Sequence, residues 1–234
     1  MRRLAGDGAT VVVADVDERG GQQVADNFKA SGLSVEAETL DVTDEGEVAA
    51  MVDAVIERHG RLDVLVCSAA VEVRASVVEC SDDDWQRILD VNLKGPFLCM
   101  RAAIPVMAAN GGGAVIALGS TLGLIVAPGH PAYCASKGAL VNLCKQAAIE
   151  HAPDNVRVNV VAPSATDTGL FIRFSAQAPD PAALRQRIAD LNPMHRLGTA
   201  REVCDAVVFL ASDASSYTSG CVVPVDGALA ARRV

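Results

Sequence analysis

The sequence predicts an α/β fold, a doubly wound parallel sheet covered by helices on both faces, as three layers of a single domain over residues 1–234. Short runs rich in β-branched residues alternate along the chain with longer helix-competent segments, which is typical of a parallel sheet. Half of the residues are hydrophobic and only 3% are aromatic, which suits a core built from Ala, Val, Leu and Ile. We find no repeat, linker or second domain.

The expected strands are residues 9–14, 33–40, 62–67, 114–118, 156–161 and 221–225. The expected helices are residues 18–30, 44–59, 81–107, 131–150 and 199–211, with the end of a helix at 1–7 and a short helix near 182–190. Thr43, Ser81 and Thr199 are expected to cap three of these helices, Thr199 in a capping box with Glu202. The acidic triplet after Ser81 is then part of a helix start and not a metal site.

The composition excludes several classes of function. Twenty basic residues against 29 acidic residues give a net charge of −9, which argues against a nucleic-acid partner. The seven cysteines form no Cys-x-x-Cys pair, so we expect free thiols in a reducing cytoplasm. The four histidines are scattered, so we expect no metal site. Neither a signal peptide nor a membrane span is expected, because every apolar stretch is too short or is interrupted by Gly and Pro.

Three polar residues between positions 119 and 137 form a candidate catalytic group. Tyr133 and Lys137 are four residues apart, so on a helix they lie on one face, one turn apart. A phenol has a pKa of about 10, and a nearby ammonium favours the phenolate, which makes the phenol a better acid and base. Ser120 follows an apolar run, where a loop can direct its hydroxyl into a cleft. We therefore predict an acid/base phenol, a cation that tunes it and a hydroxyl that holds a substrate oxygen.

With these motifs the sequence resembles the classical short-chain dehydrogenase/reductases over nearly its whole length. Ser120 stands 13 residues before Tyr133, and Tyr133-Cys-Ala-Ser-Lys137 matches the family's Tyr-x-x-x-Lys box. The resemblance includes Asn92 in Asp-Val-Asn-Leu-Lys-Gly, residues 156–163 and residues 225–227. It implies a Rossmann-like fold and hydride transfer between a secondary alcohol, or its ketone, and NAD. By resemblance, Tyr133 is the acid/base, Lys137 lowers its pKa and binds the nicotinamide ribose, Ser120 holds the substrate oxygen, and Asn92 supports a water that relays protons to Lys137.

The glycine-rich turn of this family has no counterpart in the chain. Dinucleotide folds need such a turn after their first strand to hold the pyrophosphate. By resemblance the chain begins inside the family's first helix, and the strand before it normally lies between the strands that end at Asp15 and Cys67. We therefore expect a gap in the sheet, poor solubility and weak cofactor binding. Two explanations remain open: Met1 is an internal methionine of a longer protein, which we favour, or the chain is a truncated paralogue with impaired cofactor binding.

The resemblance also implies a set of cofactor contacts. A carboxylate at the end of the second family strand, here Asp15, accepts hydrogen bonds from ribose hydroxyls and repels the 2′-phosphate of NADP, so it implies NAD. The other cofactor-binding candidates are Asp41, Val42, Ser68, Ala69, Tyr133, Lys137, Pro163, Thr166 and Thr168. Ser68 and Ala69 lie where the family has Asn-Asn-Ala-Gly, and residues 163–168 replace Pro-Gly-x-Ile-x-Thr, so the contacts at both places are expected to differ.

Residues 164–198 are expected to form a flexible loop region over the substrate, whose apolar side chains suggest a small, fairly apolar alcohol or ketone. We expect a homo-dimer or homo-tetramer that packs through the helices near 82–107 and 131–150. The alternative is a non-catalytic or cofactor-impaired paralogue that acts as a subunit or binding module. A serine hydrolase is excluded, because Ser120 lies in no Gly-x-Ser-x-Gly elbow and no histidine is placed as its base.

Overall fold

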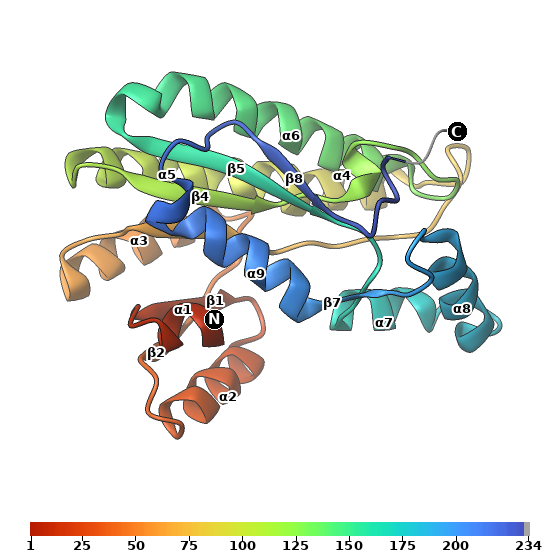
Figure 1. Ribbon diagram of the computed structural model, residues 1–234, viewed down its shortest axis with the longest axis horizontal. Helices are drawn as coiled ribbons and strands as arrows, with labels where there is room; N and C mark the ends of the chain where they lie inside the picture. The colour runs from red at the N-terminus through yellow and green to blue at the C-terminus, as the bar shows by residue number, and fades with distance from the viewer. Residues whose placement is uncertain (232–234) are drawn as a thin grey trace.

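The computed structural model describes residues 1–231 and has the expected layers of sheet and helix (Figure 1). In this part of the chain the strands are β1 (Val11–Asp15), β2 (Val35–Thr39), β3 (Val64–Cys67), β4 (Gly113–Leu118), β5 (Val156–Pro163), β6 (Thr166–Asp167), β7 (Gly198–Thr199) and β8 (Val222–Val225). The α-helices are α1 (Arg2–Gly6), α2 (Glu18–Lys29), α3 (Glu45–His59), α4 (Asp82–Leu89), α5 (Gly95–Ala109), α6 (Pro131–His151), α7 (Gly169–Ser175), α8 (Pro181–Leu191) and α9 (Ala200–Ala211). The α/β class and the parallel strands are confirmed.

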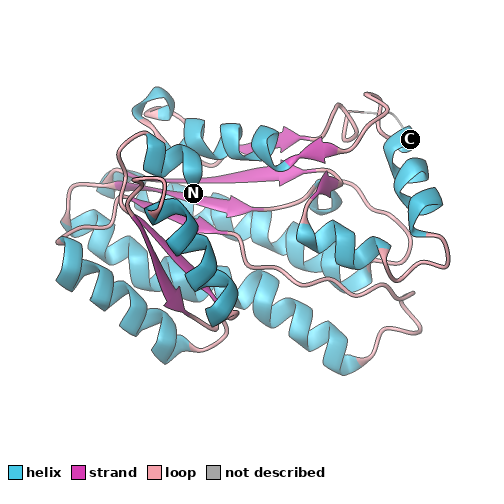
Figure 2. Ribbon diagram, turned by 90° about the horizontal axis from the view of Figure 1, so that it is seen from below, coloured by secondary structure: helices cyan, strands magenta, loops and turns pink. Residues whose placement is uncertain are grey.

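The strands do not form one continuous sheet. β3, β4, β5 and β8 pair in that order, all parallel, whereas β1 and β2 form a separate parallel pair. The β1–β2 pair is inclined to the four-stranded sheet (Figure 2). Over residues 1–231, β1 pairs only with β2 and β3 pairs only with β4, so the expected gap is present. A third, two-residue pairing joins β6 to β7.

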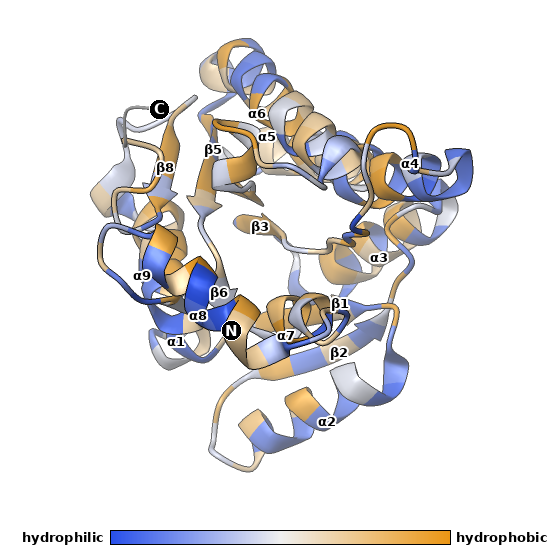
Figure 3. Cartoon of the chain, turned by 90° about the vertical axis from the view of Figure 1, so that its right-hand side faces the viewer, coloured by the Kyte–Doolittle hydropathy of each residue, from blue (hydrophilic) through white to orange (hydrophobic). Residues whose placement is uncertain are grey.

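Helices cover both faces of the four-stranded sheet, because successive side chains of a strand point to opposite faces. On β4, Val115 faces the larger core, which contains residues of α5 and α6, and Ile116 faces the core under α9. The strands β3, β5 and β8 are mostly hydrophobic, as expected for strands covered on both sides (Figure 3). This packing fixes the carboxyl ends of β3, β4, β5 and β8 at one edge, where the candidate site lies.

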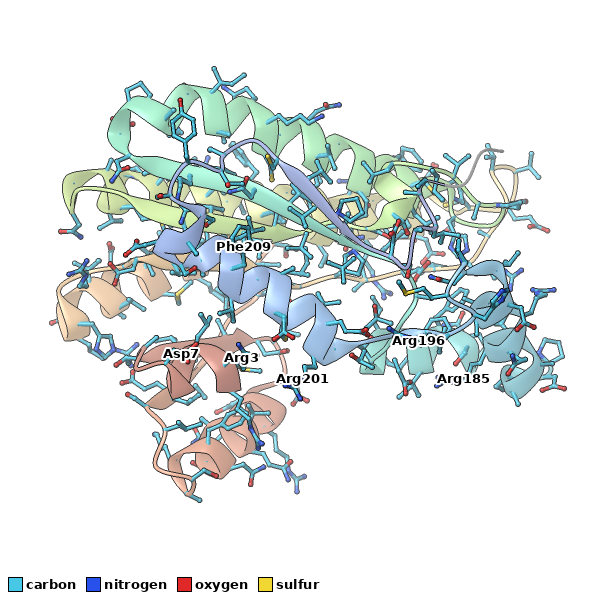
Figure 4. The ribbon with its side chains drawn as sticks, in the orientation of Figure 1. Arg3, Asp7, Arg185, Arg196, Arg201 and Phe209 are labelled. Atoms are coloured by element: carbon cyan, nitrogen blue, oxygen red, sulfur yellow. The ribbon has the colours of Figure 1, made fainter. Side chains whose placement is uncertain are left out.

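The β1–β2 pair has a small core of its own with α1 and α2, in which Ala25 and Val35 are fully buried. An ion pair joins this part to the main body, where Arg3 Nη1 of α1 lies 2.5 Å from Asp205 Oδ1 of α9. The side chain of Arg3 extends from α1 below α9 (Figure 4). Both partners are about half exposed, so this contact stabilises the arrangement only weakly.

Helix boundaries follow the sequence expectations with three differences. Ser81 and Thr199 cap α4 and α9 as predicted, and Thr199 forms the capping box. Thr43 is not a cap: its N–H and hydroxyl donate to Asp41 Oδ1, and Asp44 caps α3 instead. The long helix expected over 81–107 contains a π-helical turn at Asp90–Lys94, and the irregular segment after residue 164 contains the unpredicted α7. No helix of the described chain is long and apolar enough to span a membrane.

Candidate active site

Ser120 lies in the loop that leaves β4, as the sequence predicts. It is 8% exposed, and its Oγ accepts a hydrogen bond from the backbone N–H of Leu122 at 3.1 Å. Two glycines let this loop pack closely. A Cβ at Gly119 would lie 2.6 Å from Cγ1 of Val160, and one at Gly123 would lie 2.8 Å from the Lys137 carbonyl group. The loop is therefore held against β5 at Gly119 and against α6 at Gly123 by contacts that a larger residue would block.

Tyr133 and Lys137 share the buried face of α6, one turn apart. They are 8% and 2% exposed, and Lys137 Nζ lies 5.7 Å from the centroid of the Tyr133 ring. Lys137 Nζ also donates a hydrogen bond to the Leu118 carbonyl oxygen at 2.7 Å. The predicted helical spacing thus brings the phenol and the ammonium together beside the end of β4. The Ser120 hydroxyl belongs to the same group, because it lowers the pKa of the phenol.

The electrostatics of this group differ from the sequence expectation. Burial raises the pKa of Tyr133 well above its usual value, the Glu72 carboxylate raises it further, and the hydrogen bond with Ser120 lowers it. Lys137, expected to lower the pKa of the phenol, is not among the groups that shift it. Its own pKa falls to about 8, chiefly because burial disfavours the charged ammonium. Burial has the largest effect on both pKa values because the two side chains are enclosed. The spacing of Tyr133 and Lys137 in the sequence does not reveal this burial.

Asn92 is fully buried within the π-helical turn and holds the loop after β3. Its Oδ1 accepts the Val71 N–H at 2.8 Å, and its Nδ2 donates to the Val71 carbonyl at 2.9 Å and to Ser136 Oγ at 3.3 Å. Satisfying both backbone groups of one residue fixes that residue in place. Asn92 therefore positions the loop, and its predicted support of a proton-relaying water stays a prediction.

The two carboxylates predicted to contact the cofactor lie at the ends of β1 and β2. Asp15 is exposed, and its Oδ1 accepts the N–H of Asp17 at 3.0 Å. The carboxylate of Asp41 accepts two hydrogen bonds from Thr43, which lower its pKa. Val42 packs against Gly95, where a Cβ would approach its Cγ2 to 2.8 Å. Asp15 thus keeps oxygen lone pairs for a ligand, whereas Asp41 is largely used in its own turn.

The remaining cofactor candidates follow β3 and β5. Ser68 and Ala69 are exposed directly after β3. Pro163 ends β5, and Thr166 is buried with its Oγ1 donating to the Ser164 carbonyl at 2.9 Å. Thr168 donates to the Thr166 carbonyl at 3.3 Å. These residues lie at the carboxyl edge of the sheet, together with the end of β4.

The polar groups of Lys137 and Asp15 suit the two riboses of a nicotinamide cofactor. Lys137 uses one N–H for Leu118 and so retains donors for ribose hydroxyls, while Asp15 offers carboxylate oxygens for the other ribose. The pyrophosphate finds no equivalent cradle within residues 1–231, since Gly6 and Gly8 precede β1 instead of following a strand. The residues present therefore suit the two riboses of the cofactor, and they provide no backbone N–H groups for its pyrophosphate.

The structure adds two residues that sequence reasoning missed. Glu72, in the loop after β3, places its Oε1 2.7 Å from Nδ1 of His130, the residue before α6. Both side chains are only 12% exposed. Their positions in the chain are 58 residues apart, and neither belongs to a motif (130 − 72 = 58). The only signal in the sequence is that His130 stands three residues before Tyr133.

Comparisons with known proteins identify the family of the chain. The family model described as enoyl-(acyl carrier protein) reductase matches residues 1–229. The cis-4-hydroxycyclohexanecarboxylate dehydrogenase of Sinomonas cyclohexanicum is 38% identical over 227 residues, covering 97% of this chain and 88% of the relative. The inactive 2-(S)-hydroxypropyl-CoM dehydrogenase 2 of Xanthobacter autotrophicus is 36% identical over 225 residues, covering 96% of each protein.

A solved structure gives the same result for the fold. The gluconate 5-dehydrogenase of Burkholderia cenocepacia, in complex with NADP and tartrate, superposes with a TM-score of 0.92 at 31% identity. The match covers 99% of this chain and 89% of that protein. Sequence and fold therefore point to one family of oxidoreductases.

Proposed function

Because this chain belongs to the short-chain dehydrogenase/reductase family, we propose that it is an NAD(H)-dependent oxidoreductase acting on a secondary alcohol or its ketone. The observation that carries the proposal is the buried group of Ser120, Tyr133 and Lys137, with Lys137 Nζ 5.7 Å from the Tyr133 ring. A hydroxyl, a phenol and an ammonium buried together at the carboxyl edge of a parallel sheet suit proton transfer to and from an alcohol.

Each residue of the site has its own role in the proposed reaction. Ser120 binds the substrate oxygen, and Tyr133 takes the hydroxyl proton during oxidation and returns it during reduction. The nicotinamide, when bound, accepts or supplies the hydride. Lys137 binds the ribose with the N–H groups that Leu118 leaves free. Asn92 holds the adjoining loop in place and supports the proton-relaying water.

NAD is the proposed cofactor because of Asp15. Its exposed carboxylate lies at the end of β1. There it can accept hydrogen bonds from ribose hydroxyls, and it would repel the 2′-phosphate of NADP. The related gluconate 5-dehydrogenase binds NADP, so the preference depends on this side chain and not on the family. Asp41, Val42, Ser68, Ala69, Pro163, Thr166 and Thr168 are the further proposed contacts.

We also propose a homo-dimer or homo-tetramer in the cytoplasm. The outer surface of α5 exposes Phe97 and that of α4 exposes Trp85, while α6 exposes Ile149 by 80%. A groove between these helices is lined by Leu89, Leu93, Phe97 and Leu143. Apolar side chains gathered on long helices favour packing against a second copy. Residues 164–198 are the proposed cover of the substrate.

A non-catalytic paralogue is the second candidate. The relative from Xanthobacter autotrophicus carries an inactive designation, and the pyrophosphate has no cradle in residues 1–231. The two candidates differ in a thermal-shift titration with NAD, NADH and NADP, followed by an assay of secondary-alcohol oxidation. The enzyme is expected to be stabilised most by NADH or NAD and to form NADH. No shift with any nucleotide and no NADH would support the paralogue and refute the enzyme.

A further inference from the structure

Glu72 and His130 form a largely buried polar pair that has no role in the reaction described above. Their nearest atoms, Oε1 and Nδ1, are 2.7 Å apart and form an ion pair when the imidazole is protonated, while within residues 1–231 Nδ1 of His130 makes no hydrogen bond. A buried polar atom without a partner costs free energy unless a ligand or water satisfies it. A hydroxyl group of a ligand can therefore add a hydrogen bond to this pair.

The pair lies beside the proposed acid/base group. His130 directly precedes α6 and stands three residues before Tyr133. The Glu72 carboxylate acts electrostatically on both Tyr133 and Lys137, which places it in the neighbourhood of the acid/base group. The positive end of the α6 dipole favours an ionised carboxylate at this point.

The pair is held by rigid neighbours on several sides. Both backbone groups of Val71, the residue before Glu72, are bound by Asn92. The Ala75 N–H donates to the Gly129 carbonyl at 3.1 Å, which joins the loop to the residue before His130. Phe174 of α7 covers the imidazole, with ring centroids 5.6 Å apart. The carboxylate is thus positioned between the loop after β3, the start of α6 and the segment proposed to cover the substrate.

We propose that Glu72, positioned by His130, is a specificity-determining residue that accepts a hydrogen bond from a second hydroxyl group of the substrate, next to the reacting carbinol. This inference rests on the proposed function and names its substrate class as neutral vicinal diols and polyols. An ionised carboxylate only accepts hydrogen bonds, so it suits a hydroxyl donor. The Glu72 carboxylate repels a substrate carboxylate at close range. A plain hydrocarbon chain offers it no hydrogen-bond donor.

A hydroxy acid is the rival substrate class. The relative from Sinomonas cyclohexanicum is named for an anionic cyclic alcohol, and this chain has a cation nearby, because the exposed side chain of Arg74 lies along Gly129. In that case Arg74 would bind the anion and Glu72 would be unfavourable. The two classes predict opposite effects of removing the negative charge of Glu72.

The test measures equilibrium binding of three probes by ligand-observed NMR: cyclohexanol, vicinal cyclohexanediol and 4-hydroxycyclohexanecarboxylate. The proteins are the full chain, Glu72→Gln and the matched control Glu79→Gln. Glu79 lies in the same loop and is exposed, and its carboxylate accepts hydrogen bonds from the N–H and the hydroxyl of Ser76. We expect the wild type to bind the diol about ten-fold more tightly than cyclohexanol, as one charge-assisted hydrogen bond provides. Glu72→Gln loses most of that preference and binds the anion more tightly, whereas Glu79→Gln keeps the wild-type pattern.

Three outcomes would overturn the assignment: no diol preference in the wild type, a preference that survives Glu72→Gln, or tightest binding of the anion by the wild type. If Glu72→Gln fails to fold, Glu72→Asp decides, with a reduced preference expected and an unchanged one contradicting the assignment. Oxidation of the alcohols with NAD is followed in parallel. A Glu72-dependent diol preference without oxidation refutes the proposed enzyme and supports the role of Glu72 in binding.

Discussion

Lys137 binds the carbonyl oxygen of Leu118 at 2.7 Å, which ties the catalytic helix α6 to the last residue of β4. The contact places a buried ammonium beside Tyr133 and directly behind the loop of Ser120. It also means that the protein keeps a charge in an enclosed site, where burial is unfavourable. The candidate site therefore carries a stability cost that can be measured.

Replacing Lys137 by Met is expected to stabilise the fold at neutral pH while removing activity. A fall in the Lys137 pKa from 10.5 to about 8 corresponds to about 3 kcal/mol of unfavourable burial. Loss of the hydrogen bond to Leu118 offsets about 1 kcal/mol, so the free energy of unfolding should rise by about 2 kcal/mol. Urea unfolding measures it, with Lys145→Met, an exposed site on the same helix, as the control.

The gain from that substitution should depend on pH in a defined direction. The wild-type penalty is complete below about pH 8 and disappears as the pH rises from about 8 to about 10.5, because there the unfolded chain still holds a proton that the folded chain has released. The advantage of Lys137→Met should shrink over that window. An advantage that is constant with pH, or a destabilised variant, would show that Lys137 is not a buried cation.

Asn92→Ala should destabilise the protein through the loop after β3. The substitution leaves both backbone groups of Val71 without their side-chain partner in a site where Asn92 is fully buried. We expect a loss of about 2 kcal/mol in the free energy of unfolding, read from the urea midpoint. The exposed Asn110→Ala, at the end of α5, should change it by less than about 0.5 kcal/mol. Equal changes in the two variants would remove Asn92 from its positioning role.

Asp15→Ser should weaken the preference for NAD over NADP. The substitution removes the carboxylate that repels a 2′-phosphate, so the ratio of the two dissociation constants should move toward NADP by about ten-fold. Fluorescence titration with NADH and NADPH measures the ratio. Asp26→Asn, on the exposed face of α2, is the matched control. A ratio that stays at the wild-type value in Asp15→Ser would assign cofactor choice to other residues.

The gap in the sheet should be visible in amide hydrogen exchange. The Asp63 carbonyl accepts the Ala114 N–H, and in a parallel strand alternate residues direct their backbone groups to opposite sides. Val64 and Val66 therefore point away from β4 toward the gap, whereas Leu65 points to β4. We expect fast exchange at Val64 and Val66 and slow exchange at Leu65. Slow exchange at all three amides would mean that another strand fills the gap.

Much of this architecture was predictable because it depends on local chemistry. The β-branched runs predict the strands, the Thr199 capping box fixes the start of α9, and the spacing of Tyr133 and Lys137 places them on one helical face. The resemblance also predicts the gap in the sheet, and over residues 1–231 β1 pairs only with β2 and β3 only with β4. These features need only the sequence near them or a familiar order of motifs.

Other features depend on packing between distant segments. The rise in the pKa of Tyr133 comes from burial, which no spacing reveals. The Glu72–His130 pair joins segments from opposite sides of α4 and α5 in the chain, so neither residue stands out by itself. The helix α7 lies in a segment with few sequence signals, where Phe171 and Phe174 stack and Arg185 lies over Phe171. Tertiary contacts determine these details, and only the folded chain shows them.

The most direct test of the central claim compares Tyr133→Phe with Tyr217→Phe in NAD-dependent oxidation of a secondary alcohol. The chain has two tyrosines, and Tyr217 is fully exposed, so it is a matched control. If Tyr133 is the acid/base, its variant should lose at least about 100-fold in kcat with an unchanged thermal melt, while Tyr217→Phe keeps the wild-type kcat. Wild-type kcat in Tyr133→Phe would contradict the account.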